Sequence, residues 1–137
     1  MTGAQRPRPR SGVYEASFWN YVQNCELRLQ KCSQCSQFRY PPGPVCSRCL
    51  SDQYEWQKVA GTGELISWAT FHRQYLPQIP VPFTIASVML SEGPMLIADI
   101  DTDPVLLKIG LPATLIFEDV ATGGEVWKIY RWTTALD

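Results

Sequence analysis

Four of the five cysteines form two Cys-x2-Cys pairs, Cys32 with Cys35 and Cys46 with Cys49, and ten residues separate the pairs. Two such turns can bring four thiolates around one tetrahedral zinc at about 2.3 Å each. A redox dithiol needs only one pair in a thioredoxin-like setting, whereas an iron–sulfur centre also accepts four thiolates. Because four thiolates leave no open position for a catalytic water, the pattern favours one structural zinc per chain.

The fifth cysteine offers a weaker candidate for chemistry. Cys25 lies outside the two pairs and His72 is the only histidine, so these residues are the chain's candidate nucleophile and base. The surrounding sequence predicts Cys25 on a helix and His72 on a strand, and no pattern brings them together. We therefore expect Cys25 to be a small buried residue and His72 an ordinary imidazole, and we predict no catalytic residue in this chain.

Three aspartates imitate the opening of a calcium-binding loop, at Asp99, Asp101 and Asp103. The sixth position of that loop requires glycine and the twelfth requires glutamate, but this chain has Pro104 and Gly110 there. No calcium site is expected.

The cysteine pairs lie in a segment that cannot fold by burying apolar side chains. Residues 31–50 are rich in Ser, Gln and Arg and are interrupted by Pro41, Pro42 and Pro44. These prolines argue against a helix or a central strand. We therefore predict a rubredoxin-like zinc ribbon over residues 31–55, held together by its metal.

The segment before the ribbon predicts a tail and a helix. Residues 1–12 contain arginines interleaved with prolines and few apolar side chains, so we expect a disordered tail. Residues 13–30 form the helical segment, because Tyr14, Phe18, Tyr21, Val22 and Cys25 recur with a helical period and share one face over about three turns. This aromatic stripe either packs on the protein's own core or binds a partner, and the sequence leaves both open.

The rest of the chain, residues 56–137, predicts a small β-barrel. Runs rich in Val, Ile, Thr and aromatic residues alternate with turn residues. These runs are Trp56–Ala60, Glu64–Arg73, Thr84–Glu92, Met95–Asp101, Ala113–Asp119 and Val126–Thr133, with one or two helical turns at Pro104–Gly110. Five main strands from Glu64 onward indicate a Greek-key barrel of the OB type, whereas an Ig-like sandwich needs about seven strands.

The predicted fold class is therefore mainly β, with an N-terminal helix, a zinc ribbon and a C-terminal five-stranded OB-fold barrel. A Pro-rich stretch from Tyr75 to Phe83 joins the first two barrel strands and contains Pro77, Pro80 and Pro82. In this fold such a loop often carries binding, and its other interpretation is a stiffened connection without a ligand.

Charge and hydropathy restrict the function. The formal net charge is -1, and residues 11–137 hold 9 basic against 13 acidic groups, a net of -4. Because phosphate contacts need clustered Lys and Arg, a single-stranded nucleic-acid-binding module is the weaker alternative, although Trp68, Phe71, Tyr75 and Phe83 could stack on bases. No apolar run approaches the roughly 20 residues that span a bilayer, and no signal-peptide pattern is present. We therefore expect a cytoplasmic protein without a membrane partner.

The order of these parts is similar to that of a known family. In sequence they are Phe18-Trp19, Leu27 and Leu29, the first cysteine pair, Tyr40-Pro41-Pro42, the second cysteine pair, Trp56 through Gly63, and Asp103-Pro104 through Ile109-Gly110. Over about residues 15–133 this order resembles the acyl-CoA-associated zinc-ribbon/OB-fold family, long described as a domain of unknown function. Ser36 and Cys25 stand where that family usually has glycine. The first departure is expected to change the hydrogen bonds of the cysteine turn and the second to extend the helix.

The resemblance implies a small non-catalytic partner of a thiolase-fold enzyme, such as a thiolase, an acyltransferase or an aldolase that shortens steroid side chains. It implies an accessory subunit that helps to assemble the complex, with two copies of each chain and with the CoA thioester substrate passing near the barrel. The partner interface that we expect consists of large side chains on the helix and around the Pro-rich loop: Phe18, Trp19, Tyr21, Tyr75, Ile79 and Phe83.

Overall fold

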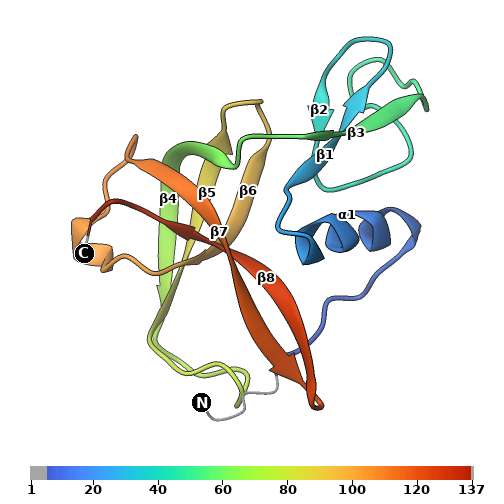
Figure 1. The fold of residues 1–137 in the computed structure, drawn as a ribbon. Coiled ribbons are helices and arrows are strands. Elements are labelled where there is room, and N and C mark those ends of the chain that lie inside the picture. Colours follow the sequence, from blue (N-terminus) through green and yellow to red (C-terminus); the bar gives the residue numbers. More distant parts are fainter. Residues whose placement is uncertain (1–5, 137) are drawn as a thin grey trace.

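The computed structural model describes residues 6–136 and is drawn as a ribbon in Figure 1. One helix, α1 (Val13–Gln23), precedes the strands. The strands are β1 (Arg28–Cys32), β2 (Phe38–Arg39), β3 (Tyr54–Lys58), β4 (Thr62–Phe71), β5 (Phe83–Leu90), β6 (Met95–Ile100), β7 (Pro112–Thr122) and β8 (Glu125–Thr133), and the 3₁₀ helix η1 is Pro104–Leu106. Neither helix in the described part of the chain is long and apolar enough to cross a membrane.

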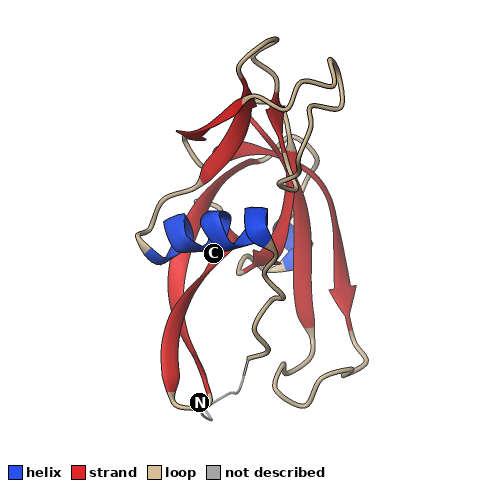
Figure 2. Ribbon diagram, turned by 90° about the vertical axis from the view of Figure 1, so that its right-hand side faces the viewer, coloured by secondary structure: helices blue, strands red, loops and turns tan. Residues whose placement is uncertain are grey.

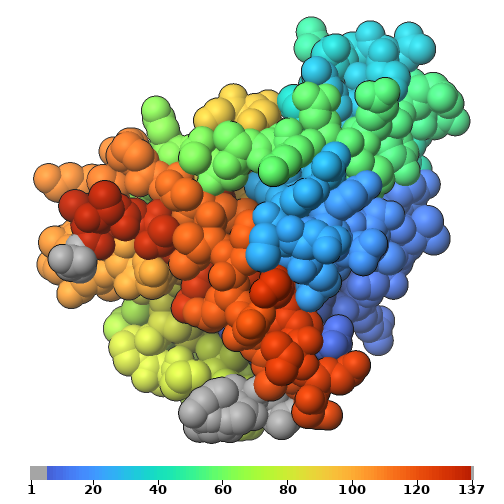
Figure 3. All heavy atoms as spheres, viewed as in Figure 1, coloured from blue at the N-terminus to red at the C-terminus, as the bar shows by residue number. Residues whose placement is uncertain are grey.

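The strands form two sheets, and the helix lies beside both of them. An antiparallel sheet in the order β2-β1-β3 makes the ribbon, and β4-β5-β6-β8-β7 form a closed barrel. In Figure 2, α1 crosses in front of the barrel and the ribbon stands at the top. In Figure 3 the ribbon forms a lobe that projects from the rest of the molecule. The predicted mainly β fold, with a helix, a ribbon and a five-stranded barrel, is confirmed.

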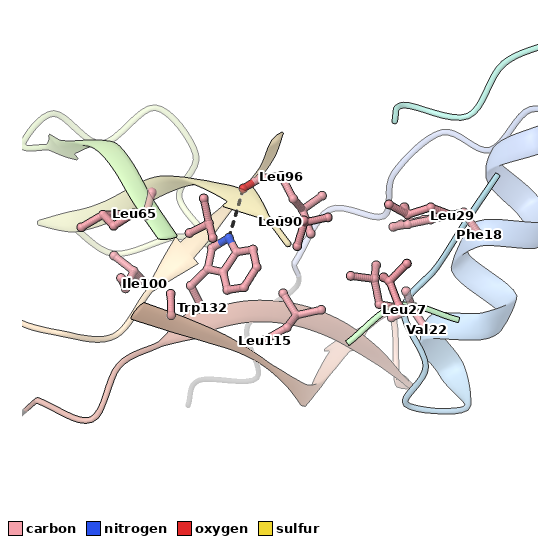
Figure 4. Packing of buried hydrophobic residues seen from close by; sticks show 14 of the residues in the cluster. Phe18, Val22, Leu27, Leu29, Leu65, Leu90, Leu96, Ile100, Leu115 and Trp132 are labelled. Carbon is pink, nitrogen blue, oxygen red and sulfur yellow. Dashed lines mark hydrogen bonds between the residues drawn. The ribbon is translucent and has the colours of Figure 1, made fainter. Parts of the chain in front are cut away.

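Alternating burial explains the barrel. Every second residue of β5 from Thr84 to Leu90 is buried, which is the pattern of a strand with one face on a core. A single parallel pair, Ile100 with Trp132, joins β6 to β8 and closes the barrel. The side chain of Trp132 is fully buried, and its indole N–H donates to the carbonyl of Leu96 at 3.1 Å (Figure 4). Trp132 therefore links the two strands at which the barrel closes.

The ribbon sheet extends beyond the predicted segment at both ends. β1 begins at Arg28, inside the range 13–30 that we predict as helical, and β3 ends at Lys58, inside the range assigned to the barrel. The register pairs Arg28 with Lys58 and Cys32 with Tyr54. Residues 56–58 therefore belong to the ribbon sheet and not to a barrel strand. Sequence patterns do not show this boundary, because hydrogen bonding between distant segments decides which sheet a strand joins.

Helix α1 ends earlier than its aromatic pattern predicts. At its start, the N–H of Gly12 donates to the carboxylate of Glu15 at 3.1 Å, as in a capping box. At its end, Cys25 has a φ of 59°, the left-handed conformation that commonly follows a helix. Cys25 is exposed, so the expectations that it extends the helix, lies on the aromatic face and is buried are wrong.

The aromatic stripe of α1 packs on the protein itself. Phe18 is 2% exposed and contacts Tyr40 of the ribbon and Tyr130 of β8, with ring centroids 5.4 and 5.9 Å away. Trp19 stacks on Tyr130 at 5.5 Å. The hydroxyls of Tyr40 and Tyr130 share a hydrogen bond at 3.2 Å, and burial raises the pKa of Tyr130 above its usual value. The helix therefore joins the ribbon to the barrel through aromatic contacts.

The N-terminal segment contacts the barrel where the structure describes it. The predicted disordered tail covers residues 1–12, of which residues 1–5 lie outside the described part of the chain. The backbone N–H of Arg6 donates to the carbonyl of Ala121 at 3.1 Å, and its guanidinium lies 3.2 Å from the carboxylate of Asp99. The guanidinium of Arg8 lies 3.4 Å from the carboxylate of Glu125. Arg6 and Arg8 therefore contact carboxylates distant in sequence, and the disordered tail stays a prediction.

Gly63 of β4 has no room for a side chain beside β5, and its replacement tests the packing of the barrel. A Cβ at Gly63 would lie 2.1 Å from the carbonyl oxygen of Met89, whereas a Cβ at Gly43 would have no heavy atom within 4 Å. We expect Gly63→Ala to lower the free energy of unfolding by about 2 kcal/mol, because backbone atoms must move. We expect Gly43→Ala to change it by about 0.5 kcal/mol at most. Urea unfolding measures both values, and equal losses would contradict this prediction.

Candidate metal centre and partner surface

The paired cysteines of the ribbon converge on one point. The Sγ atoms of all four lie within 4.8 Å of one another, with Cys32 and Cys49 3.5 Å apart and Cys35 and Cys46 3.6 Å apart. Thiolates around a tetrahedral zinc at about 2.3 Å are separated from one another by about 3.8 Å. The cluster therefore has the size that a four-thiolate metal site requires.

Backbone N–H groups of the first turn stabilise the Cys32 thiolate. The N–H of Gln34 lies 3.4 Å from the Sγ of Cys32. The N–H groups of Cys35 and Gln34 lower the pKa of Cys32 to about 6, against the effect of burial. For Cys49 the balance is opposite: the N–H of Ser51 lowers its pKa, but the hydrogen bond with the Cys32 sulfur and partial burial outweigh this and raise it to about 11.

The second turn repeats the construction of the first. The N–H of Arg48 lies 3.4 Å from the Sγ of Cys46. The N–H groups of Cys49 and Arg48 lower the pKa of Cys46, because they favour its charged form. One sulfur of each pair is therefore stabilised as a thiolate, the form that binds metal.

Ser36 preserves the geometry that glycine would allow. The N–H of Ser36 donates to the carbonyl of Cys32 at 2.9 Å, and the N–H of Leu50 donates to the carbonyl of Cys46 at the same distance. Ser36 and Leu50 have φ values of 66° and 64°, so each adopts the left-handed conformation after its cysteine pair. The two turns make equivalent hydrogen bonds although neither has glycine at this position.

Cys25 and His72, the candidate nucleophile and base, are not brought together by the fold. Cys25 follows α1 and is exposed, and His72 follows β4 and is exposed. No hydrogen bond links them in the described part of the chain. Among the described residues, the only cluster of His, Cys, Asp and Glu with metal-binding geometry is the ribbon cluster.

The helix residues predicted for the partner interface are largely engaged within the chain. Phe18 is buried. Trp19 is half-buried and, with Trp127, lines a groove of about 480 Å³. Tyr21 is half-buried and contacts Trp56, with ring centroids 5.7 Å apart. Of these three residues, only Trp19 and Tyr21 keep surface that a partner can reach.

The predicted residues of the Pro-rich loop are more accessible. Tyr75 is 68% exposed and Ile79 is half-buried. Phe83, at the start of β5, stacks on Phe71 of β4 with ring centroids 4.7 Å apart and planes 3° apart. The loop therefore continues directly into an aromatic pair on the barrel strands.

A row of exposed apolar residues on β5 and β6 lies outside the predicted interface set. Met89, Met95 and Ile97 are 46%, 46% and 50% exposed, and Met89 pairs with Met95 in the register. The sequence does carry a signal for this surface. Residues 83–90 are apolar on both faces of the strand, a pattern typical of strands that are covered on both sides.

Comparison with known families assigns both parts of the chain. Residues 19–55 match the model described as the rubredoxin-like zinc ribbon domain of ChsH2, and residues 56–118 match the model described as the C-terminal OB-fold domain of ChsH2. The chain belongs to the ChsH2 zinc-ribbon and OB-fold family. The resemblance to an acyl-CoA-associated family of this architecture is thereby confirmed, and the cysteine cluster lies in a zinc ribbon domain.

Individual proteins are similar over most of the chain. The probable enoyl-CoA hydratase alpha subunit of Thermomonospora curvata is 33% identical over 113 residues, which are 82% of this chain and 35% of that protein. A DUF35 domain-containing scaffold protein of Methanothermobacter thermautotrophicus is 28% identical over 111 residues, which are 78% of this chain and 84% of that one. A chain of a solved structure, the Ltp2-ChsH2(DUF35) aldolase, is 27% identical with a TM-score of 0.84, over 94% of this chain and 100% of that chain. The chain thus spans about a third of the hydratase subunit.

Because the four cysteines form one site, we expect the loss of a single cysteine to affect both the metal content and the structure of the ribbon. We expect Cys46→Ser to reduce zinc from about one per chain to almost none and to unfold residues 31–50, because this segment has little apolar burial to replace the metal. Elemental analysis and limited proteolysis measure the two effects. As a matched control, Cys25→Ser should keep the zinc. Stoichiometric zinc in Cys46→Ser, or iron in wild-type protein purified without oxygen, would contradict the assignment.

Proposed function

We propose that the chain is a non-catalytic accessory subunit of a complex with a thiolase-fold enzyme that acts on acyl-CoA thioesters. The observation that carries this proposal is the similarity over 94% of the chain to a chain of the Ltp2-ChsH2(DUF35) aldolase, with a TM-score of 0.84. The scaffold name of the Methanothermobacter relative supports a role in assembly. The reaction of the complex would make or break a carbon–carbon bond, by thiolysis, by condensation or by retro-aldol cleavage, or transfer an acyl group.

The reacting groups are proposed to come from the larger partner. A nucleophilic cysteine needs a base within hydrogen-bond reach. Cys25 and His72 lie on separate elements of this chain, and the other four cysteines form the ribbon cluster. The residues of this chain would therefore bind and position, while the partner performs the chemistry.

We assign one zinc per chain to Cys32, Cys35, Cys46 and Cys49, and its role is structural. A bound zinc would compensate the charge of the thiolates and hold the two turns together. The burial of Cys32 and Cys46 and the N–H groups directed at their sulfurs suit this role. No residue of this set is left to activate a substrate.

The partner interface is proposed to include the accessible members of the predicted set. These are Trp19, Tyr21, Tyr75, Ile79 and Phe83, whereas Phe18 is left out because it is buried. Large aromatic side chains of this kind are enriched in the cores of interfaces. Two thiolase-fold subunits would pair with each other, and each would bind one copy of this chain, so the complex would hold two copies of both chains. The CoA thioester would pass near the barrel and its Pro-rich loop.

The hydratase name of the Thermomonospora relative does not carry over to this chain. The matched region is 35% of that alpha subunit, so the greater part of the relative lies outside the similarity. The match covers 82% of this chain, and the family models place the ribbon and the OB-fold barrel within residues 19–118 of it. The shared region therefore supports an accessory role better than it supports hydration.

Coexpression tests the proposed function. We expect the thiolase-fold subunit of the same host to have little thiolytic, condensing or retro-aldol activity on acyl-CoA compounds when alone, and to gain at least about tenfold activity when it is purified with this chain. The variants Cys25→Ala and His72→Ala should leave that gain unchanged, because neither residue is proposed to react. Full activity of the larger subunit alone would refute the accessory role. Activity of this chain alone that disappears in either variant would refute it too.

A further inference from the structure

The outer sheet face is the side of β4, β5 and β6 that points away from the barrel core, and these three strands are neighbours in Figure 1. Its large apolar residues are Phe71, Phe83, Ile85, Met89, Met95 and Ile97. The register sets Phe71 opposite Phe83 and Met89 opposite Met95. The alternate residues of β5 are buried in the barrel. The strands therefore present apolar side chains on both of their faces.

This face is open in the described chain. Met89, Met95 and Ile97 are each about half exposed, at 46%, 46% and 50%. Helix α1 packs against β8 and β1, on the side that joins the barrel to the ribbon. The N-terminal segment reaches one side of this face: the guanidinium of Arg6 lies 3.2 Å from the carboxylate of Asp99, and residues 6–9 line a groove together with Ile85 and Ile97. The part of the outer sheet face around Met89 and Met95 lies outside this groove and is open.

The uncompensated charges around the outer sheet face are mainly acidic. Arg6 and Arg131 approach this face, but their guanidinium groups lie 3.2 and 3.8 Å from the carboxylate of Asp99 and are compensated there. No Lys or Arg occurs between Arg73 and Lys108, so β5 and β6 contribute no cation. Glu64 stands opposite Met89 in the register, and Asp101 and Asp103 are exposed beyond the other end of β6. Nucleic-acid grooves on OB barrels need cations along this surface. An acidic border around an apolar centre instead fits a protein surface that is apolar at its centre and basic at its edge.

The outer sheet face is also continuous with the predicted loop contacts. Phe83 belongs to both surfaces and stacks on Phe71 at 4.7 Å. Tyr75 contacts Phe71, with ring centroids 6.4 Å apart. A partner that covers the Pro-rich loop would therefore extend onto β5 and β6 without a break.

We propose that the outer sheet face is the docking surface for the catalytic subunit, and that the surface it receives is apolar with a border of Lys and Arg. This inference rests on the function proposed above and adds the place and the chemistry of the contact. A rigid sheet face loses little conformational entropy on binding, so buried apolar side chains at its centre contribute directly to affinity.

A pair of matched substitutions tests the site. Ile97→Lys places a cation at the centre of the outer sheet face, and Val126→Lys places one on β8, where Val126 is 69% exposed. We expect Ile97→Lys to weaken binding of the purified catalytic subunit by about tenfold or more, and Val126→Lys to change it by about twofold at most. Titration calorimetry measures the affinity. Thermal unfolding and zinc content of each variant show that the fold is kept.

The outcomes separate this inference from the proposed function. Complex formation that Ile97→Lys leaves unchanged would overturn the docking surface and leave the accessory role standing. Absence of any complex with the wild-type chain would overturn both. A dimer of this chain, or binding of single-stranded DNA, that Ile97→Lys abolishes would show a different occupant and would overturn the inference.

Hydrogen exchange on the wild-type chain gives a test that does not depend on any variant. We expect the peptides that cover β5 and β6 to exchange at least about threefold more slowly in the complex than in the free chain, while the cysteine turn at Cys46–Cys49 stays unchanged. Protection confined to the helix and the ribbon would place the contact elsewhere and overturn the inference.

Discussion

The ribbon has no hydrophobic core of its own, and the rest of the structure depends on how it is held. Within residues 31–55 the buried side chains are Cys32, Arg39 and Cys46. Two of these belong to the cysteine cluster, and Arg39 lies over the ring of Tyr54 at 5.1 Å. Apolar burial of this size cannot offset the conformational entropy of so many residues. The convergence of the four sulfurs is therefore the constraint that fixes β1, β2 and β3 relative to one another.

The barrel depends on this constraint through the helix. Once β1 and β3 are fixed, Trp56 presents its ring to Tyr21 of α1 at 5.7 Å. On the next turn Phe18 contacts Tyr130 of β8 at 5.9 Å. The side-chain amide of Gln23 donates to the carbonyl of Lys128 and accepts from its N–H, so it satisfies backbone groups of β8. The ribbon, α1 and the barrel thus share one core, and a loosened metal site would weaken contacts far from the metal.

Sequence patterns predicted the helix, the cysteine turns and the strands well, because each of these elements is determined mainly by residues that are close together in the sequence. The cysteine spacing identifies the two turns, and alternation identifies the strands from Thr62 onward. The features that sequence patterns missed depend on contacts between residues that are far apart in the sequence. Arg6 pairs with Asp99, 93 positions away, and β3 joins β1 rather than the barrel. The left-handed φ of Cys25 is a third example, because the helical period continues past the residue at which the helix ends.

The distribution of aromatic residues also bears on how an accessory subunit can be specific. The helix aromatics are engaged largely inside the chain, where Phe18 is buried and helps to position the ribbon, and most of the exposed large apolar residues lie in the barrel part of the chain. Because β4, β5 and β6 are paired along most of their length, the backbone that carries their outward side chains is fixed before any partner arrives. Apolar contacts contribute to affinity but do not distinguish one partner from another. The chain has no Lys or Arg from Gln74 to Leu107, and this absence disfavours binding of phosphate groups and of acidic protein surfaces. Specificity would then arise from the charge of the border, and affinity from the apolar centre.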